Sequence, residues 1–156
     1  TGGGSGSTEP ANKYNLSNPT KNAYGDTTWD CVWFGSYYQK DTNGDGTADT
    51  SDKKEPIKWR VLSVDGDDAF LLADYALDCQ QYDTTYTDTN IPSNTNISWE
   101  ICTLRSWLNG YGKSSNIYGT DYYNNNFVGK AFSSSEQSAI IKKTIKNQIL
   151  IWWKHV

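Results

Sequence analysis

The chain has 156 residues, a formal net charge of −4 and a sequence pI of about 4.9. This length predicts one domain with a core of ordinary size. The acidic balance and scattered lysines argue against a nucleic-acid partner, and no run of eighteen apolar residues predicts membrane insertion.

Residues 1–27 are rich in Gly, Ser, Asn and Thr, which predicts a flexible linker or a surface-wrapped tail before a single domain at 28–156. Strand-forming residues then fill 28–39, 57–64 and 69–74. Asp65-Gly66-Asp67-Asp68 is typical of a hairpin turn between the last two strands.

The segment 41–52, which is inserted between the first two strands, has the pattern of a twelve-residue calcium loop. Oxygen side chains occupy loop positions 1, 3, 5, 9 and 12, and Gly46 occupies position 6, where the chain must bend sharply. Asp at position 12 resembles the loops of bacterial dockerins rather than EF-hands, which have Glu there. The predicted ligands of a structural Ca²⁺ are Asp41, Asn43, Asp45, Thr47, Asp49 and Asp52. An acidic hairpin loop without an ion remains the alternative.

Two helices are expected in the second half of the chain. Ser98 as N-cap and Asn109-Gly110 as the end predict the first helix, and the capping box Ser133–Glu136 begins a second that runs to about Lys146. Long loops are expected at 80–96 and 111–126, and a short strand at 149–153. Five tryptophans are expected in the core, namely Trp29, Trp33, Trp59, Trp99 and Trp107.

Three cysteines leave at least one thiol without a partner within the chain. A disulfide between Cys79 and Cys102 and three buried free thiols are both compatible with the sequence.

Five ordered blocks resemble one uncharacterised family of extracellular domains from gut anaerobes. They are Phe34-Gly-Ser-Tyr-Tyr-Gln39, Pro56-Ile-Lys-Trp-Arg-Val-Leu62, Leu71-Leu-Ala-Asp74, Trp99–Asn109 and Ala131–Glu136. The resemblance implies an α+β fold of antiparallel strands and two helices, similar to C-type lectins. The second half of the family pattern is missing here, so a truncated version of that fold is implied. An extracellular location, on a bacterial cell surface or secreted, follows from the same resemblance.

We expect no enzyme, because the one histidine lies next to the C-terminus and the carboxylates lie in loops without an apolar frame to shift their pKa. Seven Trp and eleven Tyr, with abundant Asn and Asp, favour a surface that binds glycans. The predicted ligand-binding residues are Tyr122, Tyr123, Asn124 and Asn125. The competing hypothesis is a module that binds a host or bacterial surface protein, or a structural spacer.

Overall fold

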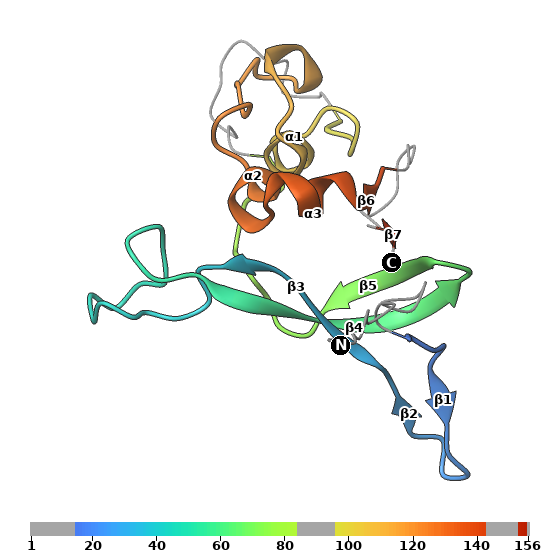
Figure 1. Ribbon diagram of the computed structural model, residues 1–156. Helices are drawn as coiled ribbons and strands as arrows, with labels where there is room; N and C mark the ends of the chain where they lie inside the picture. The colour runs from blue at the N-terminus through green and yellow to red at the C-terminus, as the bar shows by residue number, and fades with distance from the viewer. Residues whose placement is uncertain (1–14, 84–95, 143–152, 156) are drawn as a thin grey trace, which may run out of the picture.

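The computed structural model describes residues 15–83, 96–142 and 153–155, and it has an α+β fold in which every strand pair is antiparallel (Figure 1). A five-stranded sheet has the order β3-β4-β5-β7-β6, and β1 and β2 form a separate hairpin. The strands are β1 (Thr20–Lys21), β2 (Thr27–Thr28), β3 (Cys31–Tyr37), β4 (Glu55–Asp65), β5 (Asp68–Ala73), β6 (Ile140–Ile141) and β7 (Trp153–His155). The helices are α1 (Thr103–Asn109), the 3₁₀ turn η1 (Lys113–Ser115), α2 (Phe127–Ala131) and α3 (Ser134–Ser138).

The three strands expected from composition are confirmed as β3, β4 and β5. Side chains alternate between buried and exposed along β3 and β4, as they must when only one face of a sheet is covered. Asp65 pairs with Asp68 across a two-residue turn in which Gly66 has a φ of 59°, so the predicted hairpin is also confirmed.

The helices cover one face of the sheet and close the core against it (Figure 1). Aromatic rings make the central contacts: Phe34 lies 4.9 Å from Phe132, and Trp107 lies 5.8 Å from Phe127, between ring centroids. The buried core residues are Val32, Phe34, Tyr37, Ile57, Trp59, Val61, Ala69, Leu71, Trp107, Phe127, Ala131 and Phe132. Two layers packed in this way form one hydrophobic core.

The expectation that five tryptophans lie in the core is wrong for two of them. Trp59 and Trp107 are buried and Trp99 is half-buried, but Trp33 is 60% exposed and Trp29 is 36% exposed. The pleat explains Trp33, because its neighbours Val32 and Phe34 both face the core and the residue between them must face outward. Trp29 stacks instead on the guanidinium of Arg60, 5.3 Å from its ring centroid.

The first predicted helix ends where expected but begins five residues after the predicted N-cap. Ser98 accepts backbone hydrogen bonds in a preceding turn, and the side chain of Cys102 caps α1 by accepting from the backbone N–H of Arg105. Gly110 ends the helix in the left-handed conformation with a φ of 70°. A sulfur cap is not among the strong N-cap preferences, which explains why the sequence pattern favoured Ser98.

The second predicted helix is also shorter than expected. Its capping box is confirmed, with Ser133 and Glu136 bonded reciprocally, but α3 ends at Ser138 and the β-branched pair of β6 then joins β7. Residues 143–152, with most of the strand expected at 149–153, lie outside the described residues.

A third helix, α2, was not expected. It begins at the end of the predicted loop 111–126, where the Asn126 side chain accepts from Gly129 N–H at 2.6 Å.

The expected disulfide is corrected, and part of the N-terminal segment is described. All three cysteines are free, so no disulfide joins Cys79 to Cys102, whose buried sulfur already caps α1. Of the predicted linker or tail at 1–27, residues 15–27 include β1 and part of its hairpin, which projects from the domain (Figure 1), while residues 1–14 are not described. Leu16 packs against the core at the start of this segment. Ser17 bonds to the Asp30 carboxylate through its N–H at 2.8 Å and its hydroxyl at 2.6 Å, which holds this segment in place.

Candidate functional site

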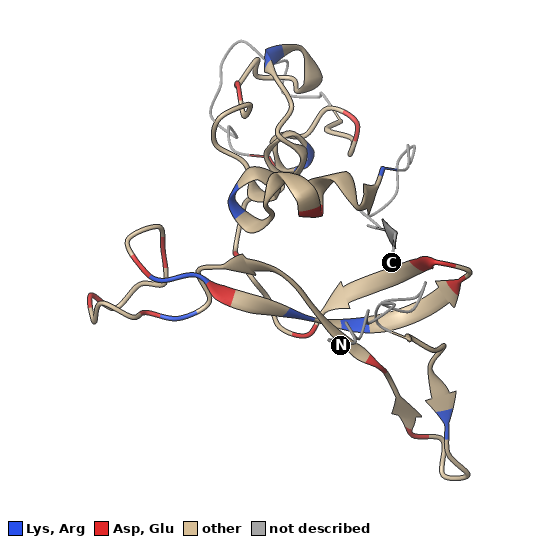
Figure 2. Cartoon of the chain, viewed as in Figure 1, with Lys and Arg blue, Asp and Glu red and all other residues tan. Residues whose placement is uncertain are grey.

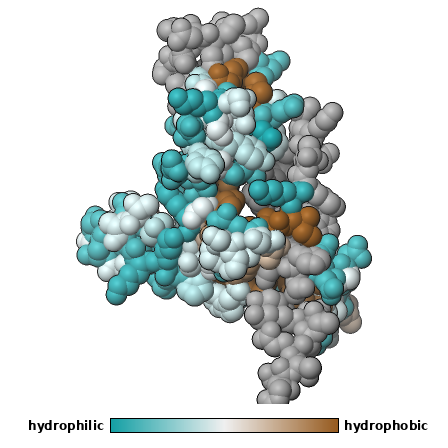
Figure 3. Space-filling model, turned by 45° about the horizontal axis from the view of Figure 1, so that its top comes forward, coloured by the Kyte–Doolittle hydropathy of each residue, from teal (hydrophilic) through white to brown (hydrophobic). Residues whose placement is uncertain are grey.

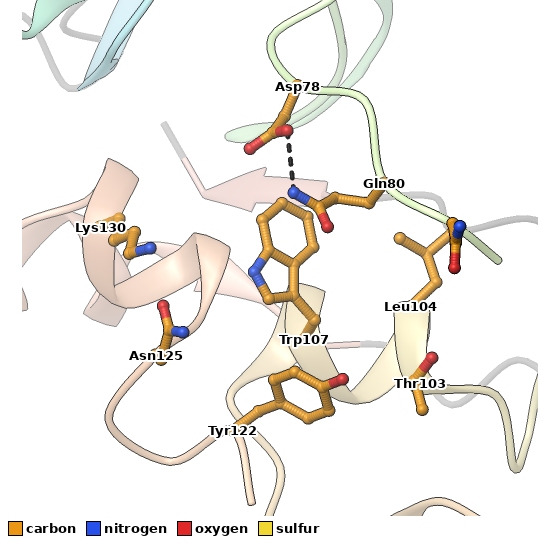
Figure 4. Close-up of a pocket in the computed structure, with 9 residues that line it drawn as sticks. Asp78, Gln80, Thr103, Leu104, Trp107, Tyr122, Asn125 and Lys130 are labelled. Atoms are coloured by element: carbon orange, nitrogen blue, oxygen red, sulfur yellow. Dashed lines mark hydrogen bonds between the residues drawn. The ribbon is translucent and has the colours of Figure 1, made fainter. Parts of the chain in front are cut away.

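A pocket of about 230 Å³ opens within the helical layer, between α1, α2 and the segment that follows β5 (Figure 4). Most of its lining side chains are polar, and two large aromatic rings lie among them. The lining residues are Asp78, Gln80, Gln81, Thr103, Leu104, Trp107, Tyr122, Asn125 and Lys130. They come from three stretches that are distant in sequence and that only the tertiary fold brings together.

The indole of Trp107 stands at the centre of the lining residues, with Tyr122 at one side (Figure 4). Trp107 is only 9% exposed, because it projects from α1 onto the core, where it packs against Phe127. Tyr122 is half-buried and also packs against the core. The backbone N–H of Tyr122 donates to the Tyr111 carbonyl at 3.1 Å, and this hydrogen bond holds the loop segment that carries Tyr122. Both rings are therefore held by the fold before any ligand binds.

The Asp78 carboxylate closes one end of the pocket and is held by hydrogen bonds from within the protein. The Tyr37 hydroxyl donates to it at 2.5 Å, the Cys79 N–H at 2.7 Å and the Gln80 amide at 3.0 Å. Burial, and then the hydrogen bond to Asp78, raise the pKa of Tyr37 far above its usual value, so the phenol stays protonated and remains a donor. Tyr37 belongs to β3, so this bond ties the pocket to the sheet.

Lys130 and Asn125 lie at another side of the pocket, on α2 and the loop before it (Figure 4). The Asn126 cap and the backbone bond from Lys130 N–H to the Asn126 carbonyl, at 3.2 Å, hold this short helix. Within the part of the chain that the structure describes, neither the Lys130 ammonium nor the Asn125 side-chain amide has a hydrogen-bond or ion-pair partner.

Two of the four predicted ligand-binding residues, Tyr122 and Asn125, line this pocket. Tyr123, which is 75% exposed, and Asn124 lie outside its lining. Sequence reasoning did not select the other lining residues. Trp107 was expected only in the core, and nothing local in the sequence indicates that the segment 78–81 would face a helix that begins nearly fifty residues later.

The loop expected to bind calcium joins β3 to β4 and extends away from the body of the domain as a hydrophilic protrusion rich in charged residues (Figures 2 and 3). Asp52 is its anchor: it is 9% exposed, and its carboxylate accepts from the backbone of Thr42, Asn43 and Asp49 and from the Thr42 hydroxyl. The hydrogen bonds from the Asp49 and Thr42 N–H groups are the largest causes that lower the pKa of Asp52. Asp41 accepts from the N–H groups of Gly44 and Gly46 in a similar way.

Three of the predicted ligand side chains meet near Ser51. The Asn43 amide donates to Asp45 at 3.0 Å and to the Ser51 hydroxyl at 2.6 Å, and Ser51 donates to Asp49 at 2.8 Å. Thr47 contributes a backbone N–H to Asp45 at 2.9 Å. Among the described residues, no three His, Cys, Asp or Glu side chains are grouped as ligands of one metal ion. The fit to a cation is therefore partial, because the carboxylates of the loop already accept hydrogen bonds from the loop's own N–H and hydroxyl groups.

Within the described residues, no helix has the length and apolar character needed to cross a membrane. Comparison with curated proteins and with solved structures finds no match. A family model described as a domain of unknown function (DUF6273) matches residues 66–150, which include β5, all of the described helices and every residue that lines the pocket. Because this match spans more than half of the sequence, the chain belongs to the DUF6273 family.

Proposed function

We propose that this chain is a non-catalytic glycan-binding module of a bacterial cell-surface or secreted protein, with a C-type-lectin-like architecture stabilised by calcium. One observation carries the glycan part of the proposal. The pocket combines the rings of Trp107 and Tyr122 with the carboxylate of Asp78 and several side-chain amides. The extracellular location and the lectin-like architecture rest on the resemblance of the sequence blocks.

The chemistry of the pocket suits a sugar. Aromatic faces pack against the C–H groups of a sugar ring, while amides and carboxylates bond to its hydroxyls in their own planes. A volume of about 230 Å³ is below the ~300–1,000 Å³ typical of sites for drug-sized ligands. The pocket is therefore sized for a single sugar residue, such as the end of a glycan chain.

The lining residues also support a role without catalysis. Hydrolysis of a glycosidic bond requires two carboxyl groups on opposite sides of the bond. Asp78 is the one carboxylate among the described residues that line the pocket, and its oxygens are already held by Tyr37, Cys79 and Gln80. The lining residues that the structure describes include neither histidine nor cysteine, so they offer no nucleophile with an adjacent base.

Calcium in this proposal has a structural role in the loop 41–52. The loop side chains Asn43, Asp45 and Asp49 are the ones that converge, and their oxygens are the hard ligands that Ca²⁺ prefers. A bound cation would offset the repulsion between the carboxylates of this loop. The affinity expected for an extracellular structural site is about 10⁻⁴–10⁻³ M.

A specific observation favours the second candidate function, which is binding of a surface protein. The outer face of the sheet carries the exposed side chains of Trp33 and Leu72, and the exposed Tyr75 follows shortly after the end of β5. Between them lie Lys58 and Arg60, both paired with the Asp74 carboxylate. Exposed apolar side chains that gather on one face are typical of protein interfaces.

A glycan array separates the two functions. We expect binding to a coherent set of glycans in millimolar calcium, with loss of at least about tenfold in affinity for Asn125→Ala and Tyr122→Ala, since each removes a lining side chain. Tyr123→Ala is the matched control, because Tyr123 lies in the same loop but outside the pocket. Thermal unfolding of each variant checks that the fold is intact. A blank array would refute glycan binding and favour the sheet face as a protein-binding surface.

A further inference from the structure

We propose that the pocket at Trp107 selects an acidic sugar, and that Lys130 binds its carboxylate. This inference rests on the proposed glycan function and specifies its ligand class. It starts from the charges of the pocket, whose described lining residues include one anion, Asp78, and one cation, Lys130. The two groups lie on different sides of the Trp107 ring (Figure 4), and they differ in how the protein satisfies them.

Hydrogen bonds from within the protein occupy most of the Asp78 carboxylate, which keeps its negative charge. The carboxylate accepts three hydrogen bonds, two from neutral side chains and one from a backbone N–H. About one of the four lone-pair sites of this carboxylate is left, and it can accept from a sugar hydroxyl. This side of the pocket is therefore suited to a hydroxyl group of a sugar and not to a second carboxylate, which the charge of Asp78 would repel.

Lys130 presents the opposite situation. It is half-buried, and among the described residues no carboxylate, carbonyl or hydroxyl accepts from its ammonium. The ammonium points toward the indole of Trp107, that is, toward the ligand space (Figure 4). The backbone carbonyl of Lys130 accepts a hydrogen bond from Lys54, so a second cation lies beside α2. The local field on this side of the pocket therefore favours an anion.

A ligand that fills the pocket removes water from this ammonium. A neutral sugar offers it only hydroxyl oxygens, whereas a carboxylate at that position forms a charge-assisted hydrogen bond, which is about twice as strong. Asn125 lies beside Lys130 (Figure 4), and its side-chain amide, which has no hydrogen-bond partner among the described residues, can donate to the second carboxylate oxygen. The ligand class with hydroxyls on one side and a carboxylate on the other is a uronic acid or a sialic acid at the end of a glycan.

The test is an array of neutral glycans and of glycans that end in uronic or sialic acids, followed by titration of methyl glucuronide and methyl glucoside. These two sugars differ only at C6, which is a carboxylate in the glucuronide and a hydroxymethyl group in the glucoside. We expect the acidic glycans to bind, with a preference for the glucuronide of about tenfold, equivalent to about 1.4 kcal/mol. Lys130→Gln should remove the preference and Lys130→Arg should keep most of it. Lys113→Gln is the control, since Lys113 is an exposed lysine outside the pocket.

The outcomes are distinguishable. Binding of neutral glycans alone, or an acidic preference that survives Lys130→Gln, would overturn the inference and leave the proposed glycan function standing. Absence of binding to every glycan would overturn both. The preference should also fall as salt is raised from 0.05 to 0.5 M, because screening weakens a partly exposed ion pair (the Debye length is ~10 Å at 0.1 M). An unchanged preference across that range would contradict a role for charge.

Discussion

The glycine at the bend of β3 gives the sharpest test of how the helices are placed on the sheet. Gly35 has a φ of 71° and lies where the register of β3 against β4 shifts, between Trp33 and Ser36. A Cβ at this position would lie 2.6 Å from two ring carbons of Phe132 and 2.7 Å from the carbonyl oxygen of Ala131. Gly35→Ala should therefore strain the backbone and push α2 away from the sheet.

Two costs add in this variant. A non-glycine residue in the left-handed region costs about 1–2 kcal/mol, and overpacking of a tight core costs about 1–3 kcal/mol. The second cost is hard to relieve, because one of the two contacts is with backbone and because Phe132 is held by Phe34. We expect a loss of about 2–5 kcal/mol in the free energy of unfolding, against a total of ~5–15 kcal/mol for a typical domain.

Urea unfolding followed by tryptophan fluorescence measures this loss. Gly66→Ala is the matched control, since Gly66 has a φ of 59° but no neighbour within 4 Å of the added Cβ. The control should lose only the backbone cost of about 1–2 kcal/mol. Equal losses in the two variants would refute the close contact between Gly35 and Phe132, and with it the packing of α2 and α3 against β3.

Two other predictions concern the dependence of stability on calcium and on pH. If the loop 41–52 binds Ca²⁺ with the affinity proposed, 10 mM calcium stabilises chelator-treated protein by about 1.4–2.7 kcal/mol, which raises Tm by about 3–10 °C. Asp45→Ala should abolish this rise and Asp67→Ala, in the β4–β5 turn, should not; no rise in the wild type would exclude the site. The second concerns Asp74, whose pKa is lowered chiefly by its hydrogen bond from Arg60 and further by Lys58. Its contribution to stability is present above the unfolded pKa of about 3.9 and is lost as pH falls through the lower folded pKa. Asp74→Asn should thus show a shallower loss of Tm between pH 5 and 2 than wild type, and parallel curves would contradict the assignment.

The sheet could be predicted from the sequence because its signals are local. The β-branched and aromatic residues of 28–39, 57–64 and 69–74 predicted β3, β4 and β5, and the Asp-Gly pair predicted the turn at Gly66. Trp33 was expected in the core, but its position between the buried Val32 and Phe34 makes it face outward. Strand parity is the stronger constraint, since it is fixed by backbone geometry.

The helices and the pocket could be predicted only in part, because tertiary contacts decide them. The capping box at Ser133 and the stop at Gly110 were readable, but the length of α3 depends on the pairing of Ile140 and Ile141 with β7. The pocket depends on still longer connections, since Asp78, Trp107 and Lys130 come from three separate segments. Loop composition alone therefore selected Tyr122 and Asn125 together with two neighbours that lie outside the lining.

The loop 41–52 and the pocket are connected through a short series of contacts in the sheet. The loop leaves β3 just after Tyr37 and returns at Glu55, which pairs with Tyr37 across β3 and β4. The Tyr37 hydroxyl in turn holds Asp78 at the edge of the pocket. An ion that orders the loop would therefore restrict the ends of both strands and, through Tyr37, the carboxylate that faces the ligand. Such coupling predicts that a chelator weakens glycan binding even though no calcium ion contacts the sugar. Tyr37→Phe should weaken glycan binding both with calcium and with chelator, because it removes the hydroxyl that holds Asp78 and connects the loop to the pocket. Equal calcium dependence in wild type and Tyr37→Phe would show that the loop influences the pocket by another route.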